Sequence, residues 1–229
     1  MDHTRSSNII EGKHAVLEAT LSATPLVEVS FAKNFSDQKS IEKIKNALSG
    51  TSAKINFVDK NELDRISVRG SHQGVIARMK DYRYSTLEKI LEAAEQKALI
   101  IILDHIKDSG NLGAIIRSAE SVGACGVIIP NKRSASVTAA TYKTSAGAVA
   151  HMKIAQVSNI SRSIETFQEQ GFWVLGASEH SDELLWQSDL KGRIALVMGS
   201  EEDGISQLVQ QKCDFLTKLP QEGKISSLN

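Results

Sequence analysis

The stretch Leu99-Ile100-Ile101-Ile102-Leu103 decides the fold of this 229-residue chain, because every position in it is apolar. A strand with one face in water alternates apolar and polar residues, whereas a strand covered on both faces is apolar throughout. Strands of the second kind belong to parallel sheets with helices on both sides. We therefore predict a doubly wound α/β domain around this strand, with ligands at the carboxyl ends of its strands.

The sequence around this strand repeats the same alternation of strand and helix. Short apolar runs predict further strands at Gly126–Pro130, Phe172–Ala177, Arg193–Met198 and Asp214–Leu219. Helical spacing lies between them, at 112–122, 158–169 and 204–212. Gly123 and Gly171 stand directly after two of these helices, where a glycine commonly ends a helix. The sequence therefore predicts a parallel α/β domain over 97–229.

The first third of the chain predicts a smaller α/β unit with no obvious nucleophile. Its expected helices and strands are Gly12–Leu21, Leu26–Phe31, a helix through Ile41, Ile44 and Leu48, Lys54–Val58, a helix from Asp59 to Ile66, and Gly74–Ala77. Ser85 and Glu88 then form a capping-box pattern, which predicts a helix towards Lys97. We place one domain at 1–79, a linker and first helix at 80–96, and the second domain at 97–229.

Composition limits the possible functions. Lys+Arg and Asp+Glu both number 27, so the whole molecule is not a generic binder of polyanions. Cys125 and Cys213 are the only cysteines, which favours reduced thiols in the cytoplasm. The six histidines form no close cluster with cysteine, and we expect no metal site. Residues 1–7 lack the apolar core of a signal peptide, and no apolar run is long enough to span a membrane.

Three polar clusters follow predicted strands. The first is 104–117, which contains Asn111-Leu112-Gly113-Ala114-Ile115-Ile116-Arg117. The second is Met198-Gly199-Ser200-Glu201-Glu202-Asp203-Gly204-Ile205-Ser206, and the third is the segment from Leu219 to Asn229. Each also has a purely structural interpretation: a helix capped by Asn111, a polar turn before a helix, and a terminal tail. The P-loop, the dinucleotide-binding glycine motif and the G-x-S-x-G elbow are absent from the sequence.

Taken together and in this order, the clusters resemble the three motifs of the SpoU family of RNA ribose 2′-O-methyltransferases, in the knotted SPOUT superfamily. Asn111-x-Gly113-x-x-x-Arg117 matches the first motif, Met198-Gly199-x-Glu201-x-x-Gly204 the second, and Leu219-Pro220 with Ser227-Leu228-Asn229 the third. The resemblance implies an α/β fold with a deep trefoil knot, S-adenosylmethionine as cofactor, RNA as substrate and a homodimer. The family continues past Asn229 with a helix that completes the knot, and we expect that helix to lie outside this sequence.

The N-terminal part carries a second resemblance. Residues 8–16 and 71–75 are similar to the start and end of the L30e-like RNA-binding domain of bacterial 23S rRNA guanosine 2′-O-methyltransferases. Those enzymes modify a guanosine in the peptidyl-transferase region, so the likeness implies 23S rRNA as partner, with no role for DNA or membranes. The same chemistry on tRNA or another rRNA site stays open. A non-catalytic RNA-binding protein and a small-molecule methyltransferase are further alternatives.

Carried over position by position, the family pattern implies cofactor contacts at Gly199, Leu219 and Leu228. Three basic residues outside the motifs, Lys132, Arg133 and Lys143, are candidates for phosphate contacts, and a solvated surface explains them equally well.

The same pattern implies that the catalytic residues facing the substrate are Arg117, Glu201, Ser227 and Asn229, with Asn111 completing the site. A guanidinium has a pKa above about 12 and no acceptor atom, so it is a poor base. We therefore expect Arg117 to stabilise the developing alkoxide and a substrate phosphate, while a phosphate or water takes the proton. Glu201 is expected to orient Arg117, Asn229 or the guanine edge.

Overall fold

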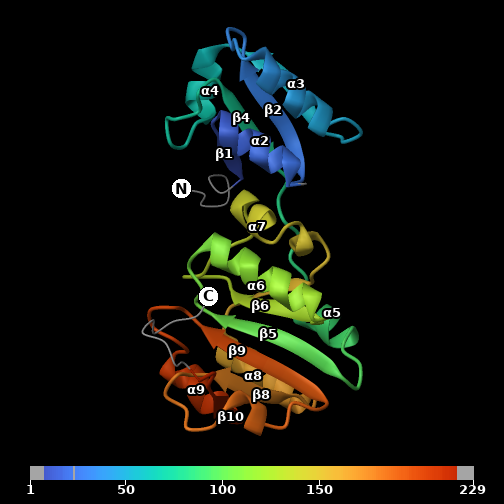
Figure 1. The fold of residues 1–229 in the computed structure, drawn as a ribbon, viewed down its shortest axis with the longest axis vertical. Coiled ribbons are helices and arrows are strands. Elements are labelled where there is room, and N and C mark those ends of the chain that lie inside the picture. Colours follow the sequence, from blue (N-terminus) through green and yellow to red (C-terminus); the bar gives the residue numbers. More distant parts are fainter. Residues whose placement is uncertain (1–7, 23, 221–229) are drawn as a thin grey trace. The chain divides into compact units, whose positions relative to one another are not determined.

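The computed structural model describes residues 8–22 and 24–220. Its contacts divide the chain into two compact units (Figure 1). The first runs to Tyr82 and also includes Val137–Gly147, and the second comprises Arg83–Ser136 and the residues from Ala148 onward. Each unit contains one sheet with its own helices.

The first unit contains a four-stranded sheet in the order β1-β4-β2-β3. Its strands are β1 (Ile9–Glu11), β2 (Leu26–Ala32), β3 (Lys54–Val58) and β4 (Val75–Met79). β4 runs antiparallel to β1 and β2, whereas β2 and β3 are parallel. The helices are α2 (Lys13–Leu21), α3 (Gln38–Ala47), α4 (Lys60–Ile66) and α7 (Ala139–Thr144). The predicted small α/β unit is confirmed, and β1 is a strand that the sequence did not predict.

Helix α7 belongs to this unit although it lies far along the chain. It packs on α2, and Nζ of Lys143 lies 2.6 Å from Oε1 of Glu18. Both side chains are about half exposed, so this ion pair contributes little stability by itself. The segment that carries Lys143 is therefore grouped with the smaller sheet by its contacts.

The second unit contains six parallel strands in the order β10-β8-β9-β5-β6-β7. They are β5 (Ala98–Asp104), β6 (Gly126–Pro130), β7 (Ile154–Val157), β8 (Trp173–Ala177), β9 (Arg193–Gly199) and β10 (Phe215–Thr217). The helices are α5 (Leu87–Glu92), α6 (Ser109–Ser121), α8 (Ile160–Glu169) and α9 (Gln207–Lys212), with short 3-10 turns at Ala148–Ala150 and Leu185–Gln187. The predicted parallel α/β fold is confirmed.

The all-apolar strand β5 is covered on both faces, as its sequence predicts. Ile100 and Ile102 are fully buried and pack with Ile164 and Phe167 of α8. Leu99 and Ile101 point to the other face, towards α6, and line a pocket there. Each fully buried apolar side chain contributes roughly 1.5–3 kcal/mol. The core on the α8 side therefore fixes the strands whose carboxyl ends carry the polar clusters.

Helix α5 corrects the prediction of a helix from Ser85 towards Lys97. It begins at Leu87 and ends at Glu92, and Oγ1 of its N-cap Thr86 accepts a hydrogen bond from the Lys89 backbone at 3.4 Å. The Ser85 backbone instead donates to Ile154 O at 2.7 Å, so Ser85 is held at the sheet by β7, which the sequence did not predict. None of the helices in the described ranges 8–22 and 24–220 is both long and apolar enough to cross a membrane.

Candidate functional site

The loop after β9 is a tight turn closed by its own backbone. The Ser200 N–H donates to Gly204 O at 3.1 Å, and the Gly204 N–H donates back to Ser200 O at 2.9 Å. A Cβ on Gly199 would lie 1.9 Å from the carbonyl carbon of Gly204, which no side chain can tolerate. Gly204 itself has φ 64°, a backbone conformation that favours glycine. Both glycines of the second motif are therefore required by this turn, which holds Glu201 at the carboxyl end of β9.

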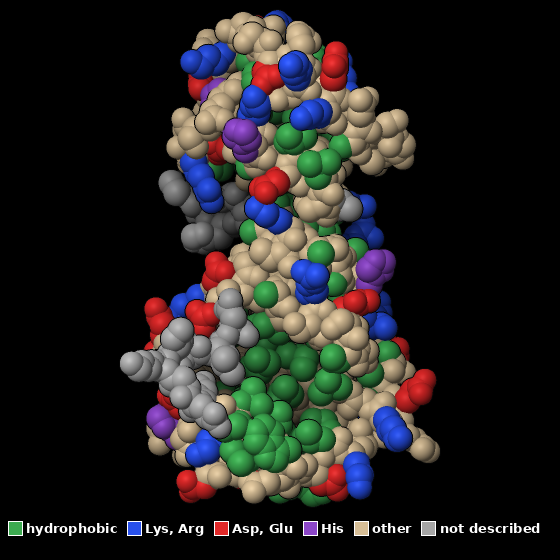
Figure 2. All heavy atoms as spheres, viewed as in Figure 1, with side chains coloured by type: hydrophobic (Ala, Val, Ile, Leu, Met, Phe, Trp, Pro, Cys, Tyr) green, Lys and Arg blue, Asp and Glu red, His purple; other side chains and the backbone are tan. Residues whose placement is uncertain are grey.

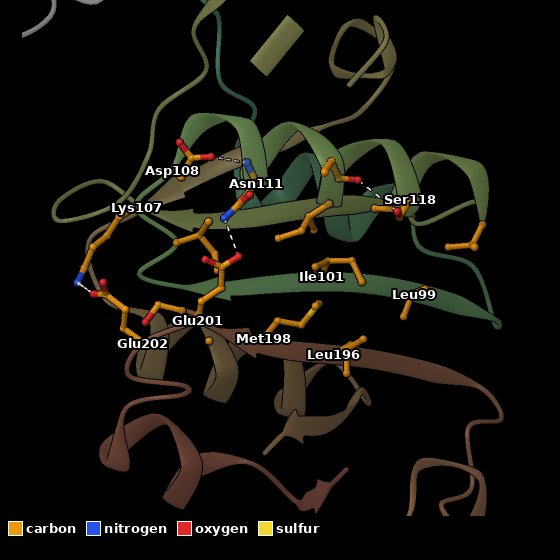
Figure 3. Close-up of a pocket in the computed structure, with 17 residues that line it drawn as sticks. Leu99, Ile101, Lys107, Asp108, Asn111, Ser118, Leu196, Met198, Glu201 and Glu202 are labelled. Atoms are coloured by element: carbon orange, nitrogen blue, oxygen red, sulfur yellow. Dashed lines mark hydrogen bonds and ion pairs between the residues drawn. The ribbon is translucent and has the colours of Figure 1, made fainter. Parts of the chain in front are cut away.

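Helix α6 begins earlier than the sequence predicts, and this frees Asn111. Asp108 is the N-cap, and its Oδ1 accepts the Asn111 backbone N–H at 2.8 Å. Asn111 is therefore not the cap of the purely structural interpretation but lies in the first turn. Its side-chain Nδ2 donates to Oε1 of Glu201 at 2.8 Å, as Figure 3 shows. The structure thus brings together two candidate residues from the first and second motifs.

Lys107 forms the rim of the same site; it lies within the first cluster, but the sequence assigned it no role. Its Nζ lies 3.3 Å from Oε2 of Glu202 and 3.4 Å from Oδ2 of Asp203. These two carboxylates, Glu202 first, raise the pKa of Lys107 above its ordinary value. All three side chains are well exposed, so the pairs orient the loop more than they stabilise the fold.

Asp104 lies beneath this loop and is the other residue of the first cluster to which the sequence assigned no role. It is 1% exposed, and its Oδ2 accepts the Ser206 backbone N–H at 2.8 Å. Its Oδ1 lies 2.5 Å from Nδ1 of His105. The sequence does carry a signal for Asp104, because it is a charged residue at the end of an otherwise apolar strand. A carboxylate buried at that position requires partners. Asp104 therefore ties the end of β5 to the chain that follows the Glu201 loop.

A pocket of about 540 Å³ opens beside the Asn111–Glu201 pair. Its walls are mainly apolar and come from β5, β9 and α6, including Ile101, Leu196 and Met198. Figure 3 shows these side chains directed into the space between α6 and the sheet, and Figure 2 shows hydrophobic side chains gathered on this face of the second unit. The charged groups lie at one end, where Lys107, Asp108, Glu201 and Glu202 line the pocket, and Ser118 lies farther along α6 (Figure 3). Such a pocket suits a ligand with a flat apolar part and a charged part.

The remaining candidate residues are placed differently. Arg117 is exposed on α6 and is not among the residues that line this pocket. Leu219 is 49% exposed just after β10. Ser227, Leu228 and Asn229 lie outside the described residues. Within the described part of the chain, no group of three His, Cys, Asp or Glu residues is arranged to hold a metal ion.

Comparisons with known proteins agree with this architecture. Residues 98–229 match the SpoU rRNA Methylase family, and residues 9–85 match the RNA 2′-O ribose methyltransferase substrate-binding family. YacO of Bacillus subtilis (strain 168), assigned to the TrmH family of tRNA/rRNA methyltransferases, is 38% identical over 229 residues, covering 99% of this chain and 91% of that protein. A tRNA/rRNA methyltransferase of Synechocystis, slr0955, is 37% identical over 226 residues, covering 97% of this chain and 59% of that protein.

A solved structure shares the fold. AviRb of Streptomyces viridochromogenes, a SpoU methyltransferase crystallised in complex with AdoMet, superposes with a TM-score of 0.69 at 21% identity, over 99% of this chain and 86% of that chain. At this identity the likeness shows the fold alone. The family match over 98–229 spans more than half of the chain, and the relative of known family is 38% identical over nearly all of it. The chain therefore belongs to the SpoU rRNA methylase family.

Proposed function

We propose that this protein transfers a methyl group from S-adenosylmethionine to the ribose 2′-hydroxyl of a guanosine in the peptidyl-transferase region of 23S rRNA. The observation that carries the proposal is the hydrogen bond between Asn111 and Glu201, which joins two family motifs 90 residues apart in one site. Membership of the SpoU family supplies the reaction class. The same reaction on tRNA is the main alternative, since relatives are described as acting on tRNA or rRNA.

The residues at this site fit S-adenosylmethionine, a cation that also carries an apolar purine. The apolar walls of the pocket suit the purine, and the turn that carries Glu201 and Glu202 lies at one end of the pocket, where a charged part of the ligand can be held. The backbone N–H groups of both residues form no hydrogen bond with any described residue, so they are free to bind a ligand. With Gly199, and with Leu219 and Leu228 as proposed further contacts, they would hold the cofactor. When bound, S-adenosylmethionine supplies an electrophilic methyl group.

The task of the protein side chains is then to orient the ribose hydroxyl and ease the loss of its proton. Alignment of the two reactants can lower a barrier by about 7–11 kcal/mol in favourable cases. Glu201 is held in one orientation by Asn111, so it can fix a donor group of the substrate. Arg117 stabilises the developing negative charge on the ribose oxygen, and a phosphate or water accepts the proton. Ser227 and Asn229 complete the proposed substrate contacts.

The N-terminal unit is proposed to recognise the RNA, and two copies of the chain are proposed to form the active dimer. The match of residues 9–85 to a substrate-binding family supports the first proposal. The family resemblance of the motifs supports the second. A molecular mass of one chain at micromolar concentration, measured by light scattering, would contradict the dimer.

The proposal is tested with rRNA and tRNA from a strain in which the gene is deleted. Purified protein with radiolabelled S-adenosylmethionine should label 23S rRNA at one guanosine, and this mark should be absent from the deletion strain. Labelling of tRNA alone would replace the rRNA assignment with the alternative. Failure to bind S-adenosylmethionine by calorimetry would revive a non-catalytic RNA-binding protein.

A further inference from the structure

A second cavity lies at the carboxyl ends of β5, β6 and β7, away from the pocket described above. It has a volume of about 330 Å³. Its lining comes from the strand ends, from the loop that contains Lys132 and Arg133, and from the N-terminus of α8. Asp104 is shared between the two regions, because it lines this cavity and also holds the chain after the Glu201 loop.

The charge of this cavity is positive. Lys132 and Arg133 are exposed, and neither forms an ion pair or hydrogen bond with any described residue. Asp104 is the one carboxylate among the lining residues, and both its oxygens are occupied by Ser206 and His105. Lys143, the third basic residue of the sequence prediction, instead pairs with Glu18. Of these three basic residues, Lys132 and Arg133 are therefore free to bind an anion, whereas Lys143 already has an acidic partner.

The N-terminus of α8 supplies donors to the same cavity. Asn159 caps this ten-residue helix by accepting the Arg162 N–H at 3.0 Å, which leaves the backbone N–H groups of Ile160 and Ser161 without a partner among the described residues. Ser161 is only 8% exposed, lines the cavity, and its hydroxyl likewise has no hydrogen bond to any described residue. Arg193 Nε is the only fully buried side-chain polar atom without a partner among the described residues, so the Ser161 hydroxyl is open to the cavity and free to bind a ligand there.

We propose that this cavity binds a phosphate group of the RNA backbone. Two unpaired cations, a helix N-terminus and an unpartnered hydroxyl around one cavity form an anion site, and phosphate offers acceptor oxygens to all of them. The RNA source rests on the proposed function. A phosphate held here would be linked through Asp104 and Ser206 to the loop that carries Glu201, so it would fix the RNA strand relative to the methyl-transfer site.

The test compares two variants with a charge-matched control. Lys132→Gln/Arg133→Gln removes both cations, and Ser161→Ala removes the hydroxyl while keeping the helix. Lys97→Gln/Lys153→Gln removes two exposed lysines beside the opposite, amino ends of β5 and β7. Affinity for deproteinised 23S rRNA is measured by fluorescence anisotropy over a range of salt concentrations. The same proteins are titrated with inorganic phosphate, followed by NMR signals of the Ile160 and Ser161 amides, and with S-adenosylmethionine.

We expect the Lys132/Arg133 variant to bind rRNA about tenfold more weakly. The slope of log Kd against log salt should fall by about one, the value for one lost phosphate contact. Ser161→Ala should lose about threefold in affinity, roughly the effect of one hydrogen bond. Affinity for S-adenosylmethionine should stay unchanged in both. An equal loss of rRNA affinity in the Lys97/Lys153 control would overturn the proposal, because the effect would then be general electrostatic attraction.

Three further outcomes separate the claims. Phosphate binding that is lost in the variants, with rRNA affinity intact, would reveal a site for free anions and overturn the RNA assignment. If the wild-type protein methylates rRNA and the variants equal it in affinity and rate, the phosphate site is wrong while the proposed function stands. If the wild-type protein transfers no methyl group but the variants lose rRNA affinity, the phosphate site stands without the proposed function.

Discussion

Nδ2 of Asn111 donates a 2.8 Å hydrogen bond to Oε1 of Glu201, which joins the first turn of α6 to the loop after β9. This contact depends on Asp108, which caps the helix and leaves the Asn111 side chain free. It also depends on the closed turn between Ser200 and Gly204, which sets the position of Glu201. The hydrogen bond between Asn111 and Glu201 therefore depends on a helix cap and a closed turn that lie far apart in sequence.

Glu201→Gln should abolish most of the activity without loss of the cofactor. The new amide can still accept from Asn111, so the geometry persists while the charge is removed. A neutral amide holds a donor group of the substrate less firmly than a carboxylate does, so the reacting hydroxyl is misplaced, and we expect methyl transfer to fall about 100-fold with S-adenosylmethionine affinity within about twofold. Glu202→Gln is the control, because the Glu202 side chain forms a hydrogen bond and an ion pair only with Lys107 among the described residues, and it should change the rate less than about threefold. Lost cofactor binding in Glu201→Gln would contradict a role in substrate orientation.

Arg117→Lys tests the proposed stabilisation of the ribose oxygen. Lysine keeps the positive charge but loses the planar fork of donors, so we expect single-turnover methyl transfer to fall about 100-fold. The matched control is Arg162→Lys, an exposed arginine on α8, which should keep the wild-type rate. A pH–rate profile of Arg117→Lys that equals the wild type in shape and height would show that the guanidinium is dispensable.

Gly199→Ala should destabilise the protein, because its Cβ would lie 1.9 Å from backbone carbon of Gly204. Relief requires movement of the backbone, so we expect a loss of at least about 2 kcal/mol in the free energy of unfolding. Gly123→Ala is the comparison: it has φ 74° but open space around its Cβ, and should cost about 1 kcal/mol. Urea denaturation measures both. Equal losses would mean that the close approach at Gly199 is relieved without cost.

From the lowered pKa of Asp37 we predict that the protein loses stability in acid. Lys13 and the hydrogen bonds from Ser40 lower its pKa from 3.8 to about 2 in the folded protein. A lowered folded-state pKa gives stability that is fully present above pH 3.8 and is lost as the pH falls towards about 2. Asp37→Asn keeps the helix cap but removes the charge, so its urea midpoint should fall less steeply with acid over this range. A slope equal to the wild type would contradict the ion pair.

Cys213 should resist alkylation in the folded protein. Burial raises its pKa to about 12, and the negative charges of Asp214 and Asp104 add to the effect. At pH 8 only about one thiol in ten thousand is then ionised, against about one in four for an ordinary thiol of pKa near 8.5. We expect iodoacetamide to modify Cys213 about a thousandfold more slowly than in concentrated urea, as followed by mass spectrometry. Equal rates would show that the thiol is not buried.

The fold was predictable where one strong local signal agreed with the tertiary structure. The uninterrupted apolar run of β5 indicated a strand covered on both faces, and the helix-ending positions of Gly123 and Gly171 are confirmed by φ of 74° and 79°. β7 was missed because Ile154-Ala155-Gln156-Val157 interrupts its apolar pattern with a polar residue. α5 was predicted too long because Ala93 and Ala94 favour helix, whereas the chain must turn there to enter β5.

The candidate site was predictable in its residues and not in its geometry. Asp108 and Asn111 are both good caps, so local preference alone does not choose between them. The choice is settled by Glu201, which lies 90 residues later and accepts from the Asn111 side chain. Asp104 and Lys107 belong to no pattern that periodicity detects, because their partners are the Ser206 backbone and the carboxylates of a distant turn.

The position of β9 has a consequence for how the protein is made. β9 lies between β5 and β8, and its pairing with β5 runs from Ala98↔Arg193 to Asp104↔Gly199, a separation of 95 residues (193 − 98). During synthesis the two flanking strands therefore leave the ribosome before the strand that joins them. Until β9 arrives, each presents an unpaired apolar edge, the kind of surface that aggregates or recruits chaperones. Folding of this unit should thus be slow, and the middle of its sheet can close only after translation has passed residue 199.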